Sequence, residues 1–91
     1  MRTHNDVTRK YLCKFIKPAR KRLKLTQEKM AEAMRMASRS LGAAERGEDG
    51  ISATTLLFFL DLLPDTEILE IVHGFPREVR QQEETEEMRR V

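Results

Sequence analysis

The sequence predicts an all-α fold of five helices, and three observations support this prediction. Residues that favour helices dominate the 91-residue chain, whereas runs of β-branched residues are absent and Gly and Pro are few. Apolar residues recur at helical spacing. Residues that commonly cap helices precede several of these stretches. A chain this short forms one domain with at most a short appendage and buries only about 60% of its unfolded surface, so dimerisation would enlarge its core.

The first predicted helix spans residues 7–22, after a start at residues 1–7 that we expect to be flexible. Its apolar residues fall on one stripe, at i, i+1, i+4, i+5, i+8 and i+12. They are Tyr11, Leu12, Phe15, Ile16, Ala19 and Leu23. Proline removes a backbone donor and clashes with the preceding turn. We therefore expect Pro18 either to kink this helix or to divide it into two pieces.

Two short helices are predicted next. Thr26 is a suitable N-cap for a helix from Gln27 to Met34, and a turn separates it from a helix over about Ser38–Arg46. Gly47 is placed to close the latter in the left-handed conformation. Neither helix can fold alone, so we expect five of their residues to face a supporting scaffold. These are Met30, Met34, Met36, Leu41 and Ala44.

The last two helices are separated by Pro64. Ser52 caps a predicted helix over residues 53–63, and a fifth helix is expected to end near His73, because Gly74 and Pro76 follow. Seven large apolar residues crowd the fourth helix, more than one face can bury in so small a domain. We expect some of them to contact the fifth helix and some a second subunit, giving a homodimer through residues 56–75. The seven are Leu56, Leu57, Phe58, Phe59, Leu60, Leu62 and Leu63.

Charge is unevenly distributed along the chain. Residues 1–47 hold 13 Lys and Arg against 4 Asp and Glu (+9), whereas residues 48–91 hold 4 against 11 (−7), for a net charge of +2. The tail, residues 76–91, is almost wholly charged, which predicts either an exposed helix or a disordered segment. A basic half attracts phosphate, and an acidic half should face away from nucleic acid.

The most informative stretch is LTQEKMAEAMRMASRSLGAAERG, residues 25–47. It resembles the Cro/repressor-type (xenobiotic-response-element) helix-turn-helix family in its opening Leu-Thr-Gln, in the small Ala31 four residues after Gln27, and in its closing Glu-Arg-Gly. The resemblance implies a lambda-repressor-like domain of five helices over residues 8–75, followed by the charged tail. In this family the third helix enters the major groove of double-stranded DNA. The resemblance also implies an ion pair between Arg20 and Glu45 and a phosphate contact at Gln27.

The third helix supplies the expected base contacts. Arg39 is the candidate for guanine, since a guanidinium pairs bidentately with that base, and Ala43 is the candidate for a thymine methyl group. Ser38 and Ser40 lie on or near the same side. Phosphate contacts, which position the protein without reading sequence, are expected from several basic residues. They are Arg35, Arg46, Lys17 and Lys21, with Lys14 as a further candidate if the first helix lies beside the DNA backbone.

Three residues depart from the family pattern. Arg35 stands where the family has a turn glycine, so either Arg35 adopts a left-handed conformation, at a cost of about 1 kcal/mol, or the turn differs. Ala37 replaces the family's serine cap, and Ser38 is expected to cap instead. Gly42 carries no side chain toward the bases and favours close approach.

The sequence therefore predicts a DNA-binding transcriptional regulator, a repressor that binds as a dimer. The alternative is an antitoxin of a toxin–antitoxin pair, which would bind a partner protein and repress its own operon. Catalysis, cofactors and metals are not expected, because nucleophile–base pairs and phosphate-cradling glycine loops are absent and His4, His73 and Cys13 form no ligand set. The single cysteine, together with the absence of a signal peptide or a membrane-spanning apolar run, predicts a cytoplasmic location in bacteria or a phage-infected cell.

Overall fold

The computed structural model describes residues 4–90, with side chains to residue 89. Within these residues the chain is all-α and has five helices, which confirms the predicted fold class. The helices are α1 (His4–Arg22), α2 (Gln27–Met34), α3 (Ser38–Glu45), α4 (Ala53–Asp61) and α5 (Asp65–Arg90).

Helix α1 is longer and more regular than expected. It begins at His4, so residues 4–7 of the expected flexible start are helical, and residues 1–3 lie outside the described part of the chain. Pro18 lies inside one continuous helix and does not divide it. Because the Pro18 side chain is exposed, its ring displaces no packed neighbour, and the helix loses only one backbone hydrogen bond.

The predicted N-caps at Thr26 and Ser52 are confirmed. The Thr26 hydroxyl accepts a hydrogen bond from the backbone N–H of Lys29 at 3.1 Å, and the Ser52 hydroxyl accepts one from Thr55 at 3.1 Å. The expectation that Ser38 caps α3 is wrong. Ala37 occupies the N-cap position without a side-chain hydrogen bond, and Ser38 is the first helical residue.

The C-terminal ends of α3 and α4 come slightly earlier than predicted. Helix α3 ends at Glu45, and Gly47 closes it at φ 76°, in the left-handed conformation expected from the sequence. The backbone N–H of Glu48 then reaches the carbonyl of Ala43 at 2.9 Å. Helix α4 ends at Asp61, two residues before the predicted end.

The predicted end of the fifth helix near His73 is wrong, because α5 continues through Gly74 and Pro76 to Arg90. The physical reason is packing at Gly74. The Tyr11 hydroxyl lies only 2.5 Å from where a Cβ on Gly74 would be, and it donates a 2.7 Å hydrogen bond to the carbonyl of Ile71. This glycine therefore permits close approach of α1 to α5 and does not terminate the helix. Of the two alternatives for the tail, the helical one holds to Arg90.

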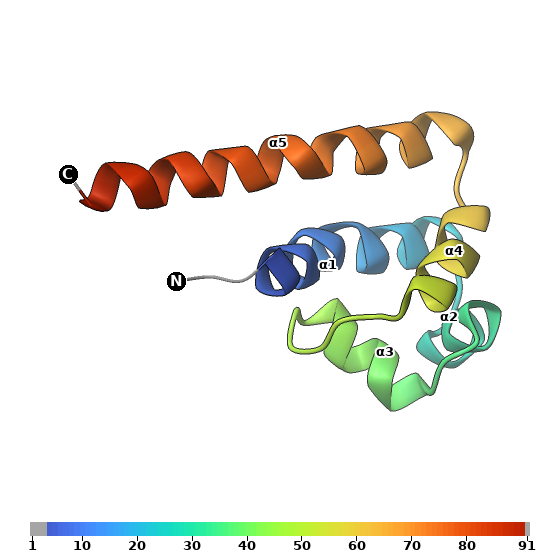
Figure 1. Cartoon of the computed structure of the whole chain (residues 1–91). Coiled ribbons are helices and arrows are strands. Elements are labelled where there is room, and N and C mark those ends of the chain that lie inside the picture. Colours follow the sequence, from blue (N-terminus) through green and yellow to red (C-terminus); the bar gives the residue numbers. More distant parts are fainter. Residues whose placement is uncertain (1–3, 91) are drawn as a thin grey trace.

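Helix α1 lies at the centre of the molecule (Figure 1). Helix α5 runs antiparallel along one side of α1 and extends past its first turn, whereas α3 lies on the opposite side. Helix α2 packs between α3 and α4. Each helix contributes to one core, whose largest fully buried side chains are Ile16, Met30, Met34, Leu41 and Phe59. Met36, the remaining methionine of the predicted core, is only partly buried against it.

Candidate nucleic-acid interface

Helices α2 and α3 form a compact pair joined by a three-residue turn. Arg35 adopts the left-handed conformation at φ 61° and ψ 44°, so of the two expected alternatives the structure takes the strained one. The turn is closed by backbone hydrogen bonds from Arg35 to Glu32 at 3.1 Å and from Met36 to Ala31 at 3.0 Å. Ala31 is 2% exposed, because its small side chain lets the neighbouring helices approach.

The inner face of α3 is buried and its outer face is accessible. Leu41 and Ala44 are fully or almost fully buried against the scaffold. On the outer side, Arg39 and Ser40 are exposed and Ala43 is half-buried, as is Ser38 at the first turn. The structure therefore gathers these four predicted base-contacting residues on one short helix.

Three side chains from three helices form a polar network behind this face. The Arg20 guanidinium on α1 donates to both carboxylate oxygens of Glu45 on α3, with Nε–Oε2 at 2.7 Å and Nη2–Oε1 at 3.3 Å. The Gln27 amide on α2 donates to Glu45 Oε1 at 3.2 Å. The Glu45 side chain is 5% exposed and that of Arg20 17%. The ion pair between Arg20 and Glu45 is thus present and partly buried, and it ties α1 to α3.

Gly42 lies on the same side of α3 as Arg39 but is buried. The Gln27 amide and the Arg46 guanidinium cover it, at 3.2 and 3.4 Å from where a Cβ would be. The sequence predicts that another group approaches α3 closely at Gly42, and within this chain that group is the Gln27 amide. Sequence reasoning missed this contact, and its only signal was a glycine in the middle of a short helix.

Arg46 is exposed and lies just after α3. Its guanidinium forms a 3.0 Å ion pair with Glu48. The hydrogen bond and opposite charge of Arg46 lower the pKa of the Glu48 carboxyl, and the same contact raises the pKa of Arg46. A phosphate at this position would therefore compete with Glu48 for the Arg46 guanidinium.

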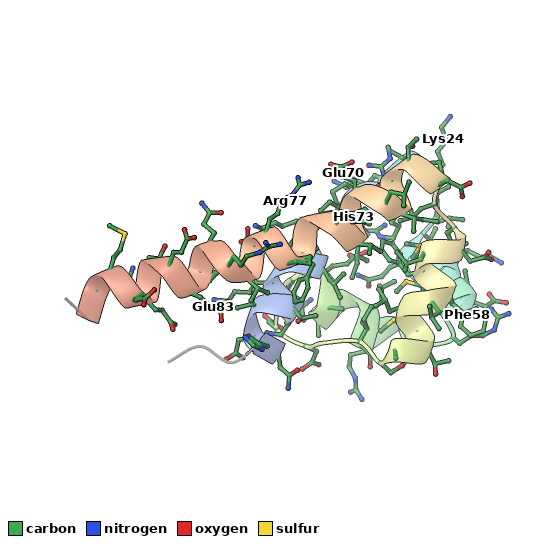
Figure 2. The ribbon with its side chains drawn as sticks, turned by 45° about the horizontal axis from the view of Figure 1, so that its top comes forward. Lys24, Phe58, Glu70, His73, Arg77 and Glu83 are labelled. Atoms are coloured by element: carbon green, nitrogen blue, oxygen red, sulfur yellow. The ribbon has the colours of Figure 1, made fainter. Side chains whose placement is uncertain are left out.

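Arg35, a further predicted phosphate contact, is engaged by neighbouring groups of the chain. Its guanidinium donates to the carbonyls of Glu32 and Ala33 at 3.1 Å each, at the end of α2. It also lies 4.6 Å from the centre of the Phe58 ring, on the outer side of α4 (Figure 2). Both contacts compensate part of the backbone strain at Arg35.

Three lysines of α1 are candidate phosphate contacts. Lys17 and Lys21 are exposed, and they lie three residues before Arg20 and one residue after it in the helix. Lys14 instead forms a 3.7 Å ion pair with Glu78 on α5. Glu78 belongs to α5, which lies across α1 from α3 (Figure 1). Because Lys14 is engaged by this carboxylate, we do not include it among the proposed phosphate contacts.

Acidic residues of α5 pair with basic residues of α1. Besides the contact at Lys14, Glu67 pairs with Arg22 and Glu83 lies 3.9 Å from His4. Figure 2 shows Glu83 directed toward the start of α1. Because α5 lies across α1 from α3, its negative charge is held away from the candidate interface.

Two further features concern other kinds of site. Among residues 4–90, no three His, Cys, Asp or Glu side chains gather as a potential metal site. Over the same residues, none of the helices combines the length and apolar character required to cross a membrane.

The short helix pair, the left-handed turn between its members and the accessible outer face of α3 define the helix-turn-helix class of DNA-binding domains. Residues 16–71, more than half of the chain, match the helix-turn-helix family of the Cro/repressor type, and the chain belongs to this family. Membership of this family implies DNA binding, and its domains are typically non-catalytic. Searches of curated proteins and of solved structures gave no match.

Proposed function

We propose that this protein is a transcriptional repressor that binds a specific DNA sequence as a homodimer. The observation that carries the proposal is the division of α3 into a buried inner face and an accessible outer face with Arg39 at its first turn. A helix presented in this way fits the major groove, where each base pair shows a distinct pattern of donors and acceptors. Bound at a promoter, the protein would block access by RNA polymerase.

Each residue of the interface has a proposed role. Arg39 pairs with guanine through its two parallel donors, Ala43 contacts a thymine methyl group, and Ser38 and Ser40 contact neighbouring groups. Arg46, Lys17 and Lys21 bind phosphates and fix the orientation of α3 in the groove. Gln27 stands at the edge of the same face.

A selection experiment tests sequence-specific binding. Double-stranded DNA of random sequence is selected by the protein at two salt concentrations, and the bound pool is sequenced. We expect a preferred sequence with a guanine opposite Arg39, and we expect Arg39→Ala to lose that preference at a cost of about 1–3 kcal/mol. Arg77→Ala, which removes an exposed arginine on α5, is the matched control and should leave the preference intact. An unchanged preference in Arg39→Ala would reject the assignment of this residue.

Dimerisation is supported by an apolar surface on α4 and α5. Leu57, Leu69 and Val72 are 67%, 56% and 50% exposed. Large apolar side chains exposed to this extent are typical of a surface that another protein covers. Leu56, Leu60 and Val72 also border a groove of about 270 Å³ between α1, α4 and α5 that is almost wholly apolar. A second copy that covers this surface would place two α3 helices in successive major grooves, about 34 Å apart.

Replacing Leu69 by Glu tests the proposed dimer surface. The charge would be buried without a partner in the dimer, so we expect this variant to be monomeric and to bind DNA more weakly. The measurement is the molar mass in solution by light scattering. Met88→Glu is the control, because Met88 is 78% exposed and lies near the end of α5, outside the surface. If the unmodified protein has the molar mass of a monomer at the concentration that saturates DNA, the proposed dimer is rejected.

The antitoxin function remains the second candidate, and the projecting end of α5 favours it. Helix α5 continues past the first turn of α1, and residues 83–89 are exposed except Glu86. Such a helix offers a surface to a partner protein without obstructing α3. The test is co-expression with the product of the neighbouring gene: rescue from growth arrest by this chain, lost when residues 83–91 are deleted, would support the antitoxin, and absence of rescue would reject it.

A further inference from the structure

The amide of Gln27 lies flat against α3 at the position where that helix has no side chain. A Cβ on Gly42 would be 3.2 Å from Gln27 Nε2 and 3.5 Å from Gln27 Oε1, so both polar atoms of the amide lie over this glycine. Any larger residue at position 42 would push the amide away. The glycine therefore allows a side chain from α2 to lie directly against α3, at the edge of its accessible face.

The orientation of this amide is fixed by Glu45. A carboxylate only accepts hydrogen bonds, so the NH₂ group of Gln27 must face Glu45 Oε1, at 3.2 Å. Glu45 is itself held by two hydrogen bonds from Arg20 and is almost fully buried. Exchange of the Gln27 oxygen and nitrogen would place a carbonyl against the carboxylate, which is repulsive. Gln27 therefore keeps one N–H and its carbonyl oxygen for a ligand.

We propose that Gln27 reads an adenine base in the major groove and that Glu45 is the residue that positions it. Adenine presents the N7 acceptor beside the N6 amino donor, and a glutamine amide matches this pair with one N–H and one carbonyl oxygen. These are the two groups that Glu45 leaves available. A phosphate offers acceptors only, so it would use the N–H but face the carbonyl oxygen unfavourably.

This inference rests on the proposed sequence-specific binding to DNA and deepens it. It assigns base readout to a residue of α2, whereas the resemblance to the family implies only a phosphate contact there. The recognition surface would then combine Arg39 and Ala43 of α3 with Gln27, seated on Gly42.

Random-sequence selection with Gln27→Ala is the first test. We expect the variant to lose about tenfold or more of its discrimination for adenine at one position of each half-site. Preference at the other positions should stay unchanged, because a contact to phosphate carries no sequence information and its loss would weaken binding to all sequences alike. Gln81→Ala, an exposed glutamine on α5, is the control and should match the unmodified protein.

Modified DNA supplies the second test. We replace the selected adenine by 7-deazaadenine, in which a C–H group takes the place of N7. The unmodified protein should lose affinity severalfold for this DNA, and Gln27→Ala should show no further loss. Glu45→Gln, with its fold checked by circular dichroism, should weaken the adenine preference at the same position, and the double variant should be no less selective there than Gln27→Ala alone.

Three outcomes are distinguishable. If Gln27→Ala weakens binding to all sequences equally, with no change in base preference at any position, Gln27 is a phosphate contact and the inference is overturned. If 7-deazaadenine has no effect on the unmodified protein, adenine readout by Gln27 is likewise rejected. If the unmodified protein selects no sequence, the proposed function itself fails.

Discussion

The hydroxyl of Tyr11 and the missing side chain of Gly74 form one packing unit. Alanine usually stabilises a helix interior by about 1 kcal/mol relative to glycine. At position 74 its Cβ would lie 2.5 Å from the Tyr11 hydroxyl, so the tyrosine would have to move and give up its hydrogen bond to Ile71. We expect Gly74→Ala to destabilise the protein by about 1–2 kcal/mol, measured by urea unfolding.

The sign should reverse when the hydroxyl is absent. In Tyr11→Phe the nearest ring atom to the new Cβ would be Cζ, at 3.6 Å, which is an ordinary contact. Gly74→Ala should then stabilise the Tyr11→Phe protein by up to about 1 kcal/mol. The same sign in both backgrounds would show that the close approach does not determine the effect.

Ionisation of Tyr11 should affect stability in alkaline solution. Burial, followed by the negative charges of Glu70 and Glu78, raises the pKa of this phenol above its usual value of about 10. The folded state then holds the proton more tightly than the unfolded state. Its contribution to stability is fully present below about pH 10 and is lost as the pH rises toward the folded pKa.

Tyr11 is the only tyrosine in the chain and Trp is absent, so its absorbance reports this ionisation alone. We expect the absorbance midpoint of the folded protein to lie above that of the protein unfolded in urea. Stability should also fall more steeply between about pH 9 and about pH 11 than in Tyr11→Phe. Coincident midpoints would contradict the prediction.

Residues whose role depends on nearby sequence could be predicted, and residues whose role depends on a distant partner could not. Thr26 and Ser52 cap helices through residues three positions away, so their pattern is visible in the chain. Gly74 instead makes room for a side chain 63 positions earlier in the sequence. A terminating glycine and a packing glycine have the same local signal, and only the fold distinguishes them.

At the scale of the elements, α5 shows how a tertiary contact overrides local propensity. Gly74 and Pro76 both favour a helix end, yet the contacts of Ile68, Ile71 and Phe75 with the core hold the segment on one helical face. The first residues of α2 and α4 were predicted correctly, because Thr26 and Ser52 cap these helices through their side chains. The candidate interface was predicted as a group of residues on α3, but its Gln27–Glu45 contact depends on how α2 crosses α3.

The proline inside α5 should be a source of instability. Pro76 cannot donate to the carbonyl of Val72, and its exposed ring makes no compensating core contact. We expect Pro76→Ala to stabilise the protein by about 2 kcal/mol, after allowing for the greater freedom of the unfolded chain. Pro64→Ala is the control. Because Pro64 precedes α5, its missing N–H lies outside the helix, and thermal unfolding should show little change.

A gain in Pro64→Ala equal to that in Pro76→Ala would indicate a general effect on the unfolded chain. No gain in Pro76→Ala would mean that the helix does not continue through this residue in solution.

At the scale of the whole molecule, charge is separated across α1. Arg39 and Arg46 lie on and just after α3, whereas acidic residues of α5 pair with Lys14 and Arg22 on the other side of the molecule. Glu48 is an exception, since it lies beside Arg46 at the end of α3. Removing its charge should free Arg46 for phosphate and raise DNA affinity a few-fold at low salt.

Glu48→Gln tests this prediction, and Glu84→Gln on α5 removes an equal charge at an exposed site far along the chain. Affinity for DNA, measured by fluorescence anisotropy over a range of salt, should rise in the first variant and stay nearly constant in the second. Equal increases would show that total charge, and not its place beside Arg46, governs the affinity.

The direction of α5 also has a practical consequence. The helix carries the chain beyond the first turn of α1, on the side opposite α3 (Figure 1). A fluorophore or a fused reporter attached behind residue 90 would therefore point outward from bound DNA. Attachment at this end should allow single-molecule imaging of the protein on DNA without steric interference at the groove.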